Sequence, residues 1–245
     1  MSDSYENDER NWPRGLHRVR GMMSVPHVLV DESGVVLLDA GFPGDPSRIR
    51  RVMEQVGAGP DDVRAILLTH GHIDHAGGLA ELKAWTGAPI YAHRLEQAHI
   101  DGVYPYNGFS KICGVLEAAG RGVTGYKPVQ IDVPLEDGME LPFWGGLRVV
   151  HLPGHTLGHC GFYSAKHRLL FSGDLWVRFM MRTQASPRIF SDDVALVPES
   201  MRKARAFGAR WVVPGHYDLP NATRLRQRFE ELCAAMERRR RPVIV

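Results

Sequence analysis

The stretch Thr69-His70-Gly71-His72-Ile73-Asp74-His75 decides the fold and the chemistry expected of this chain. About one chain in a thousand of this composition would contain the pattern His-x-His-x-Asp-His by chance, so coincidence explains it poorly. Neutral imidazoles and a carboxylate are ligands that suit zinc, with iron or manganese less favoured. The stretch therefore predicts a metal site.

The position of the stretch also favours a metal site. His70 follows the apolar run 65–68, so that His70 and His72, as alternate residues, can turn toward one side. Asp74 and His75 lie where a helix is expected to begin, and the glycines at 77 and 78 would let that helix approach its neighbours closely.

Apolar runs with strand character recur along the chain between helical patterns. The strand runs are 16–20, 27–30, 35–38, 65–68, 89–92, 147–152, 161–164, 169–171 and 210–213. The helical patterns are 46–56, 78–86, 192–207 and 222–240. Because the strands mostly come in hairpin-like pairs, with single helices between some of them, we expect an α/β fold with mixed sheets.

A weak internal repeat points to two similar halves. A hairpin, a helix and a strand that ends near a histidine follow one another twice, first at His70 and again at His216. Two such halves facing each other predict a four-layer sandwich with both histidines at one edge. The segment 94–146 fits this pattern least, so we expect a lid or insertion there, with an ordinary connecting helix as the alternative.

The composition is that of an ordinary soluble protein. The 245 residues, 44% hydrophobic and 24% charged, fit a single domain over 1–245 with a flexible end at 1–14. A formal net charge of +2 disfavours a nucleic-acid partner, and no apolar run is long enough for a membrane span. Three scattered cysteines and the lack of an apolar leader favour reduced thiols and a cytoplasmic location.

Further histidines and aspartates follow other strand runs. They lie in Pro153-Gly154-His155-Thr156-Leu157-Gly158-His159, in Gly173-Asp174 and in Pro214-Gly215-His216. Together with the first stretch, these motifs resemble the metallo-β-lactamase superfamily, and its glyoxalase II-like branch most closely. The resemblance extends from about residue 16 to residue 216, and it implies an αββα sandwich with two mixed β-sheets.

The resemblance also implies a two-metal centre with two zinc ions, for which iron or manganese is the alternative. The implied ligands are His70, His72 and His155 for the first metal, Asp74, His75 and His216 for the second, and Asp174 between the two. Asp39 resembles the aspartate that the superfamily places behind its ligands. Seven ligands suit two ions that share one carboxylate and one water and keep positions open for substrate.

The implied activity is hydrolysis. A metal-bound hydroxide would attack the carbonyl of a small ester, lactone or thioester, with Asp74 and Asp174 as catalytic residues. A lactonase or esterase is the first choice. Asp174 stands where metallo-β-lactamases usually have Cys or Ser, and the few residues after His216 leave little for a glutathione-binding domain. A β-lactam hydrolase, an iron-dependent sulfur dioxygenase-type enzyme and a silent binding module are the alternatives.

Residues around the centre complete the expectation. His151 and His159 are predicted behind the ligands, whereas His93 and His99 are expected on the surface and Cys160 in the core. The predicted substrate pocket, for which core packing is the alternative, consists of Met22, Met23, Tyr104, Tyr106, Trp176, Phe179 and Tyr217. The expected partners are a small-molecule acyl substrate and a second copy in a homodimer.

Overall fold

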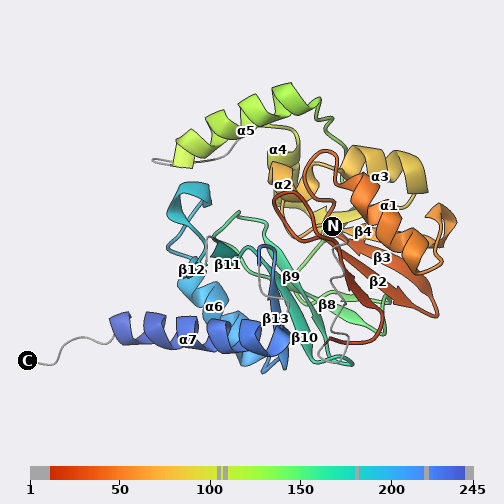
Figure 1. Ribbon diagram of the computed structural model, residues 1–245. Helices are drawn as coiled ribbons and strands as arrows, with labels where there is room; N and C mark the ends of the chain where they lie inside the picture. The colour runs from red at the N-terminus through yellow and green to blue at the C-terminus, as the bar shows by residue number, and fades with distance from the viewer. Residues whose placement is uncertain (1–11, 104–105, 107–109, 180–181, 218–220, 241–245) are drawn as a thin grey trace, which may run out of the picture.

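The computed structural model describes residues 12–103, 106, 110–179, 182–217 and 221–240, and two mixed sheets form its centre (Figure 1). The first sheet contains, in spatial order, β1 (Leu16–Arg18), β2 (His27–Asp31), β3 (Gly34–Leu38), β4 (Val63–Leu67), β5 (Ile90–His93) and β6 (Val133–Leu135). The second contains β13 (Trp211–Pro214), β10 (Leu169–Gly173), β9 (Cys160–Ser164), β8 (Leu147–His151) and β7 (Glu140–Leu141). A separate ribbon pairs β11 (Trp176–Phe179) with β12 (Arg182–Ala185).

Helices cover the outer face of each sheet. The helices are α1 (Pro46–Gln55), α2 (Ile73–Ala76), α3 (Leu79–Thr86), α4 (Gln97–Ile100), α5 (Lys111–Thr124), α6 (Val197–Ala206) and α7 (Ala222–Arg240), with short 3-10 turns at Pro60–Asp62, Arg94–Glu96 and Arg188–Phe190. In Figure 1, α1 and α3 lie on one side of the paired sheets and α6 and α7 on the other. The four-layer αββα sandwich predicted from the sequence is therefore confirmed.

Strand alternation builds the layers. In β3, Val36 and Leu38 pack between the two sheets, whereas Val35 and Leu37 face the layer that holds Ile49 of α1. The second sheet alternates in the same way, because Phe171 of β10 joins the central layer and Leu170 packs toward the helices α6 and α7. Successive side chains of a strand point to opposite faces, so runs that are apolar throughout are buried on both sides.

The structure adds elements that the apolar runs did not predict. The strands β6, β7, β11 and β12 are short, and β6 and β7 place part of the segment 94–146 within the two sheets. A lid function for the rest of that segment stays a prediction. The predicted helix 192–207 begins only at Val197, because the residues before it hydrogen-bond to another loop. Residues 1–11 of the predicted flexible end lie outside the described residues.

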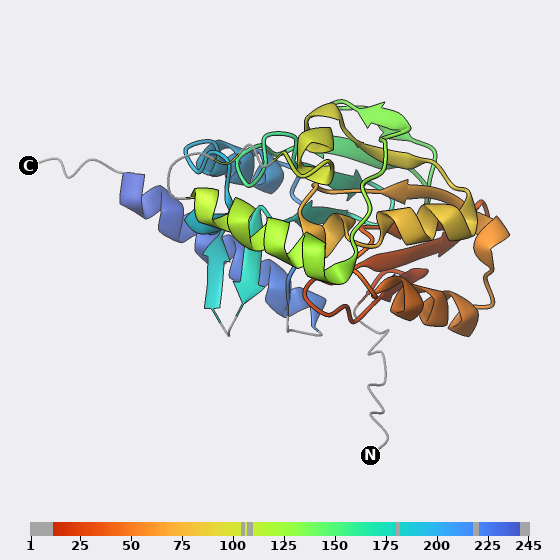
Figure 2. The ribbon, with the colours of Figure 1, turned by 90° about the horizontal axis from the view of Figure 1, so that it is seen from above.

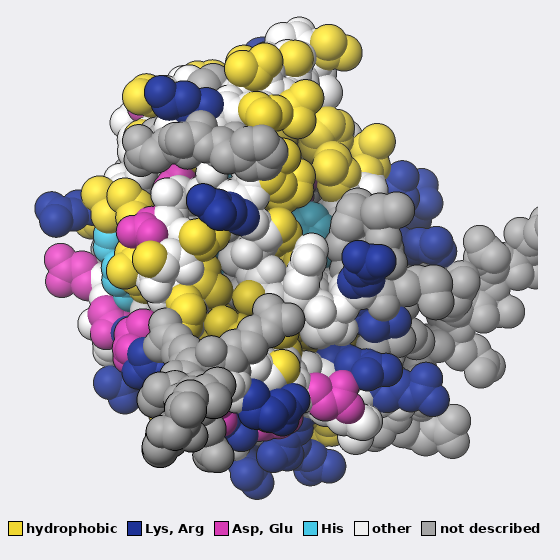
Figure 3. Space-filling view, turned by 90° about the vertical axis from the view of Figure 1, so that its left-hand side faces the viewer, with side chains coloured by type: hydrophobic (Ala, Val, Ile, Leu, Met, Phe, Trp, Pro, Cys, Tyr) yellow, Lys and Arg dark blue, Asp and Glu magenta, His cyan; other side chains and the backbone are white. Residues whose placement is uncertain are grey.

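Helix α5 has its polar face turned inward. Glu117 and Arg121 are buried, whereas Val115 and Val123 are 70% and 89% exposed. Figure 2 shows α5 lying across the top of the sandwich, and Figure 3 shows hydrophobic side chains gathered at the upper end of the molecule, where α5 lies. Burying a charge costs free energy unless the charge is paired. The charged side chains on the inner face of α5 therefore need polar partners among the residues beneath the helix.

The three cysteines lie in the interior of the protein. Cys113, Cys160 and Cys233 are buried and free, which confirms the expected burial of Cys160. Among the described residues, no helix combines the length and the apolar character that crossing a membrane requires.

Replacing His27 should flatten the acid dependence of stability. His27 is 3% exposed, and its Nε2 lies 3.1 Å from the Tyr217 hydroxyl. Burial, helped by the charge of Arg18, lowers its pKa to about 3. Below the unfolded pKa of about 6.5, only the unfolded chain binds this proton, so the free energy of unfolding falls by up to ~1.4 kcal/mol per pH unit. Urea unfolding should show that the free energy of unfolding of His27→Gln falls less between pH 6 and pH 5 than that of the wild type. An equal fall in both proteins would contradict the lowered pKa of His27.

Candidate metal centre

Seven ligand-type side chains meet where strands of both sheets end. Four of them follow β4, in the loop and short helix that contain His70, His72, Asp74 and His75. The loop between β8 and β9 contributes His155, the turn after β10 contributes Asp174, and the turn after β13 contributes His216. These are the seven residues that the sequence motifs singled out, and they come from four segments far apart in the chain.

The helix α2 is held close to the chain before it. His72 occupies the N-cap position of α2 without a side-chain cap hydrogen bond, and Ala40 donates its backbone N–H to the carbonyl oxygen of His75 at 2.8 Å. A Cβ on Gly77 would lie 2.3 Å from Pro43, and a Cβ on Gly78 would lie 2.3 Å from the oxygen of Ala40. The close approach expected at this glycine pair is therefore observed.

Two groups of three of these side chains share no residue, and a third set, His70, His75 and Asp174, links them. Ligand atoms of His70, His72 and His155 all lie within 4.8 Å of one another, and so do those of Asp74, His75 and His216. The Nε2 atoms of His70 and His155 are 3.1 Å apart, and those of His75 and His216 are 3.2 Å apart. Ligand bonds of ~2.0 Å in a tetrahedral site give a separation of about 3.3 Å between ligand atoms.

Asp174 connects the two groups. Its Oδ2 lies 3.1 Å from Nε2 of His216 and 3.5 Å from Nε2 of His155, while its Oδ1 lies 3.4 Å from Nε2 of His75. Gly215 makes room for this carboxylate, because a Cβ there would lie 2.3 Å from Oδ1. One carboxylate thus faces both histidine groups, which is the position that a bridging ligand needs.

The donor atoms fit a divalent cation. Nε2 of His72 and Oδ1 of Asp174 are buried and have no hydrogen-bond partner among the described residues. Buried polar atoms are almost always paired, so an unpartnered lone pair beside other donor atoms is what a metal-ligand position would show. Imidazole nitrogens and carboxylate oxygens are donors that zinc, iron and manganese all accept.

Electrostatics differ between the two groups. Burial, together with neighbouring imidazoles, lowers the pKa of His70 and His72 well below 6.5 and that of His155 to about 4. Burial also acts to lower the pKa of His75, but the carboxylates around it, with Asp174 first, outweigh burial and raise that pKa to about 9. The first group therefore offers neutral nitrogen donors, and the second surrounds its histidines with negative charge that attracts a cation.

Asp39 supports one histidine of each group. Its Oδ2 lies 2.8 Å from Nδ1 of His75, and its Oδ1 accepts the backbone N–H of Thr69 at 2.8 Å. The Thr69 hydroxyl also bonds Asp39 and lies 3.0 Å from Nδ1 of His70. Asp39 adopts a φ of +60°, a strained conformation that the surrounding contacts impose. Asp39 thus contacts His75 and Thr69, and its role behind the ligands stays a prediction.

The two histidines predicted behind the ligands occupy different places. Nε2 of His159 accepts the backbone N–H of Asp174 at 2.9 Å, and its Nδ1 faces the oxygen of Leu152. His151 instead stacks on His93, with ring centroids 4.6 Å apart, and bonds the oxygen of Leu157. The structure brings His159 to the centre and leaves His151 on the outer side of the loop.

The residues predicted for the substrate pocket also occupy different places in the structure. Met22 and Met23 are 57% and 58% exposed, and Tyr106 lies beside His72 with ring centroids 5.7 Å apart. Trp176 was wrongly placed in the pocket, because it is fully buried and packs on Phe229 of α7.

Three further residues of the predicted pocket lie elsewhere or outside the part of the chain whose side chains are described. Tyr217 was also wrongly placed, since its partly buried ring packs against the hydrophobic core and its hydroxyl faces the buried His27. Tyr104 lies outside the described residues, as does the side chain of Phe179.

A layer of buried polar residues was missed. His99, expected on the surface, is 1% exposed; its ring is edge-on to that of His72, and its Nε2 lies 3.1 Å from Oδ2 of Asp192. Glu96 is fully buried and accepts the backbone N–H of Gly71 at 2.6 Å. No spacing in the sequence indicates these contacts. The glycines next to ligand histidines were the available signal, because they mark a close approach of other residues.

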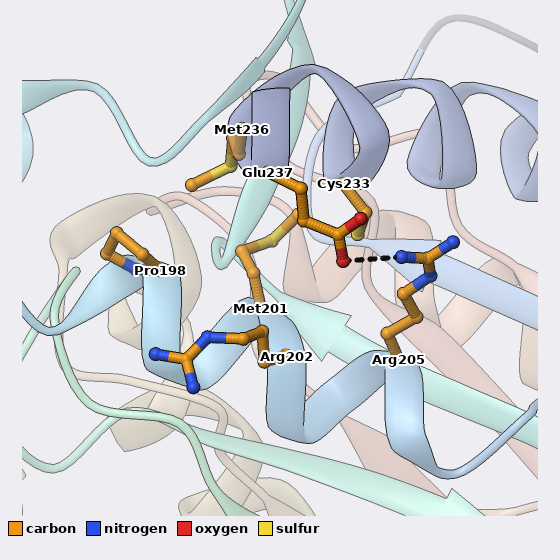
Figure 4. A pocket seen from close by; sticks show the side chains of 7 residues that line it. All are labelled: Pro198, Met201, Arg202, Arg205, Cys233, Met236 and Glu237. Atoms are coloured by element: carbon orange, nitrogen blue, oxygen red, sulfur yellow. Dashed lines mark hydrogen bonds and ion pairs between the residues drawn. The ribbon is translucent and has the colours of Figure 1, made fainter. Parts of the chain in front are cut away.

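A separate groove lies between α6 and α7 (Figure 4). It is lined by Pro198, Met201, Arg202, Arg205, Cys233, Met236 and Glu237. An ion pair of 2.7 Å joins Arg205 and Glu237 there, and none of the seven predicted ligands lines the groove. The groove is thus distinct from the histidine cluster.

Residues 20–216 match the metallo-beta-lactamase superfamily, and the chain belongs to that family. It is 34% identical over 133 residues to a hydroxyacylglutathione hydrolase of Bdellovibrio bacteriovorus, a match that covers 54% of this chain but only 41% of that protein. It is 30% identical over 211 residues to a hydroxyacylglutathione hydrolase of Pseudomonas aeruginosa, covering 80% of this chain and 68% of the relative. The solved structure of TTHA1623 in a di-iron-bound form has 28% identity and a TM-score of 0.65, covering 86% of this chain and 96% of that one.

Asp39→Asn should weaken metal binding without unfolding the protein. The amide keeps the size of the side chain, but it cannot accept from Thr69 and also face the Nδ1–H of His75 as a carboxylate does. Loss of such a partner typically costs 10–100-fold in metal affinity. Zinc titration against a competing chelator should show this loss, and wild-type affinity in the variant would exclude the supporting role of Asp39.

Proposed function

We propose that this protein is a metal-dependent hydrolase that cleaves a small ester, lactone or thioester at its carbonyl carbon, with two zinc ions as cofactor. The observation that carries the proposal is the pair of three-residue groups joined by Asp174. Two relatives named hydroxyacylglutathione hydrolase support an acyl substrate and add weight to the thioester. The di-iron form of TTHA1623 supports iron as the alternative metal.

The roles of the residues follow from their positions. Two bound divalent ions would lower the pKa of a water molecule and polarise the carbonyl of the substrate. His70, His72 and His155 would hold one ion, Asp74, His75 and His216 the other, and Asp174 would contact both. Asp74 is the more open carboxylate, with a side chain 15% exposed against 7% for Asp174. Asp74 is therefore better placed than Asp174 to meet solvent, and it would orient the attacking water by accepting its hydrogen bond.

The loop that bears the exposed Met22 and Met23 lies next to the second group. The loop that bears them is fixed to predicted ligands, since Nδ1 of His216 lies 2.9 Å from the oxygen of Met23 and the Ser24 hydroxyl donates to the oxygen of Asp74. Exposed, flexible methionine side chains adapt to apolar groups of varied shape. We therefore assign the apolar part of the substrate to this loop.

Metal analysis followed by a substrate panel tests the proposal. Protein purified without added metal should contain two zinc ions per chain, and chelation should abolish hydrolysis that zinc then restores. The panel contains p-nitrophenyl esters, γ- and δ-lactones, acyl thioesters including S-lactoylglutathione, a β-lactam and a persulfide. Iron with oxygen consumption on the persulfide would replace the proposal with a sulfur dioxygenase-type enzyme. Metal retention without any turnover would replace it with a binding module. A cytoplasmic location and a homodimer stay predictions.

Substituting both loop methionines should weaken binding of long acyl chains. In Met22→Ser/Met23→Ser, about 1–2 kcal/mol of apolar contact is lost, so KM for an octanoyl ester should rise roughly tenfold with kcat nearly unchanged. KM for an acetyl ester should stay within about twofold. Val123→Ser, on the exposed face of α5, is the matched control. An equal effect on both esters would show that the loop does not contact the acyl chain.

A further inference from the structure

A layer of buried charged side chains lies directly behind the histidines of the first group. Its members are Glu96, His99, Glu117, Arg121 and Asp192, each less than a tenth exposed. They come from the segment around α4, from α5 and from the residues before α6. Replacing such a layer by apolar residues often leaves stability unchanged or improves it, so its contacts with the ligand loops need a separate reason.

Glu96 contacts both loops that carry the first group. Its Oε2 accepts the backbone N–H of Gly71, between His70 and His72, at 2.6 Å. Its Oε1 packs against the loop of His155, where a Cβ on Gly158 would lie 2.6 Å from that oxygen, and it has no hydrogen-bond partner among the described residues. A Cβ on Gly71 would likewise lie 2.6 Å from Cβ of His99. Glycine on both loops therefore allows one carboxylate to fit between them.

The pair His99–Asp192 makes a second connection. Oδ2 of Asp192 accepts the backbone N–H of Leu157 at 2.9 Å and faces Nε2 of His99 at 3.1 Å. The backbone N–H of Asp192 also donates to the oxygen of His155 at 2.8 Å. The loop that bears His155 is thus joined to the segment that bears Glu96 by side-chain and backbone bonds.

Helix α5 holds that segment from above. Arg121 donates to the backbone oxygens of Ile100 and His99, the first at 2.7 Å. Glu117 lies 3.3 Å from the backbone N–H of Ile73, next to His72. The inward polar face of α5 therefore completes a continuous set of contacts around the first group.

We propose that Glu96, assisted by the His99–Asp192 pair, is a positioning residue that fixes the separation of His155 from His70 and His72 and thereby sets the affinity for the first metal ion. The inference rests on the metal binding within the proposed function and adds the residue that preorganises one of the two sites. Groups behind metal ligands typically contribute 10–100-fold in affinity when they hold ligands in place.

The test measures zinc binding by each site in Glu96→Ala and Glu96→Gln. Competition with a chelator should resolve two zinc ions in the wild type. Glu96→Ala should weaken one of them 10–100-fold and leave the other within about threefold. Glu96→Gln retains an oxygen that can accept the N–H of Gly71, so it should restore most of the affinity. Asp192→Ala should weaken the same ion, and it replaces Glu96→Ala if that variant does not fold.

Asp132→Ala is the matched control. Asp132 also accepts a backbone N–H, that of Ile90 at 2.8 Å, but it pairs with Lys83 away from the ligands. Its loss should change the melting temperature and neither zinc affinity. Unchanged binding of both ions in Glu96→Ala, or an equal loss at both sites, would overturn the proposal. Site-selective loss in a protein that hydrolyses nothing on the panel would overturn the proposed function and leave this inference standing.

Discussion

The arrangement depends on collecting several carboxylates and imidazoles at one edge of the sandwich, where they are largely removed from bulk water. Burial raises the free energy of any charge there, yet neighbouring histidines, His75 and His216 first, hold the pKa of Asp74 and Asp174 below its usual range. The attraction between these carboxylates and the histidines thus outweighs the effect of burial on the carboxylate pKa values. The sandwich makes this possible because strands of both sheets end at the same edge, where Cys160 donates its backbone N–H to the oxygen of Thr69.

The sequence predicted the ligands better than their surroundings. Ligand motifs follow apolar strands directly, so the spacing of His70 and His72 and the position of His216 could be interpreted from local geometry. Trp176 shows the limit of that reasoning. It lies two residues after Asp174, but it begins the strand β11 and packs toward α7. Proximity in sequence does not give the direction of a side chain when the next element was not predicted.

The buried polar layer was hidden for a related reason. Glu96 and His99 belong to short turns and connections, and Asp192 opens the predicted helix 192–207 but lies before the helix that forms. Polar residues in such positions usually lie in solvent. Helix α5 shows a further limit, because an amphipathic period gives a helix two faces and does not say which face is buried. The charged face of α5 turns inward because hydrogen-bonding groups near His99 and Ile73 are available to it.

Many of the supporting contacts are made to the loop of His155, the predicted ligand whose position the strands constrain least. Asp174 and His216 lie within two residues of a strand end, so β10 and β13 largely fix them. His155 lies in the middle of the connection between β8 and β9, where strand geometry constrains it least. Asp192, Glu96 and the ring of His151 contact that connection. At the start of the connection, Lys203 donates to the backbone oxygen of His151. Loop ligands need such external bonds because a free loop would lose conformational entropy each time it closed on a metal.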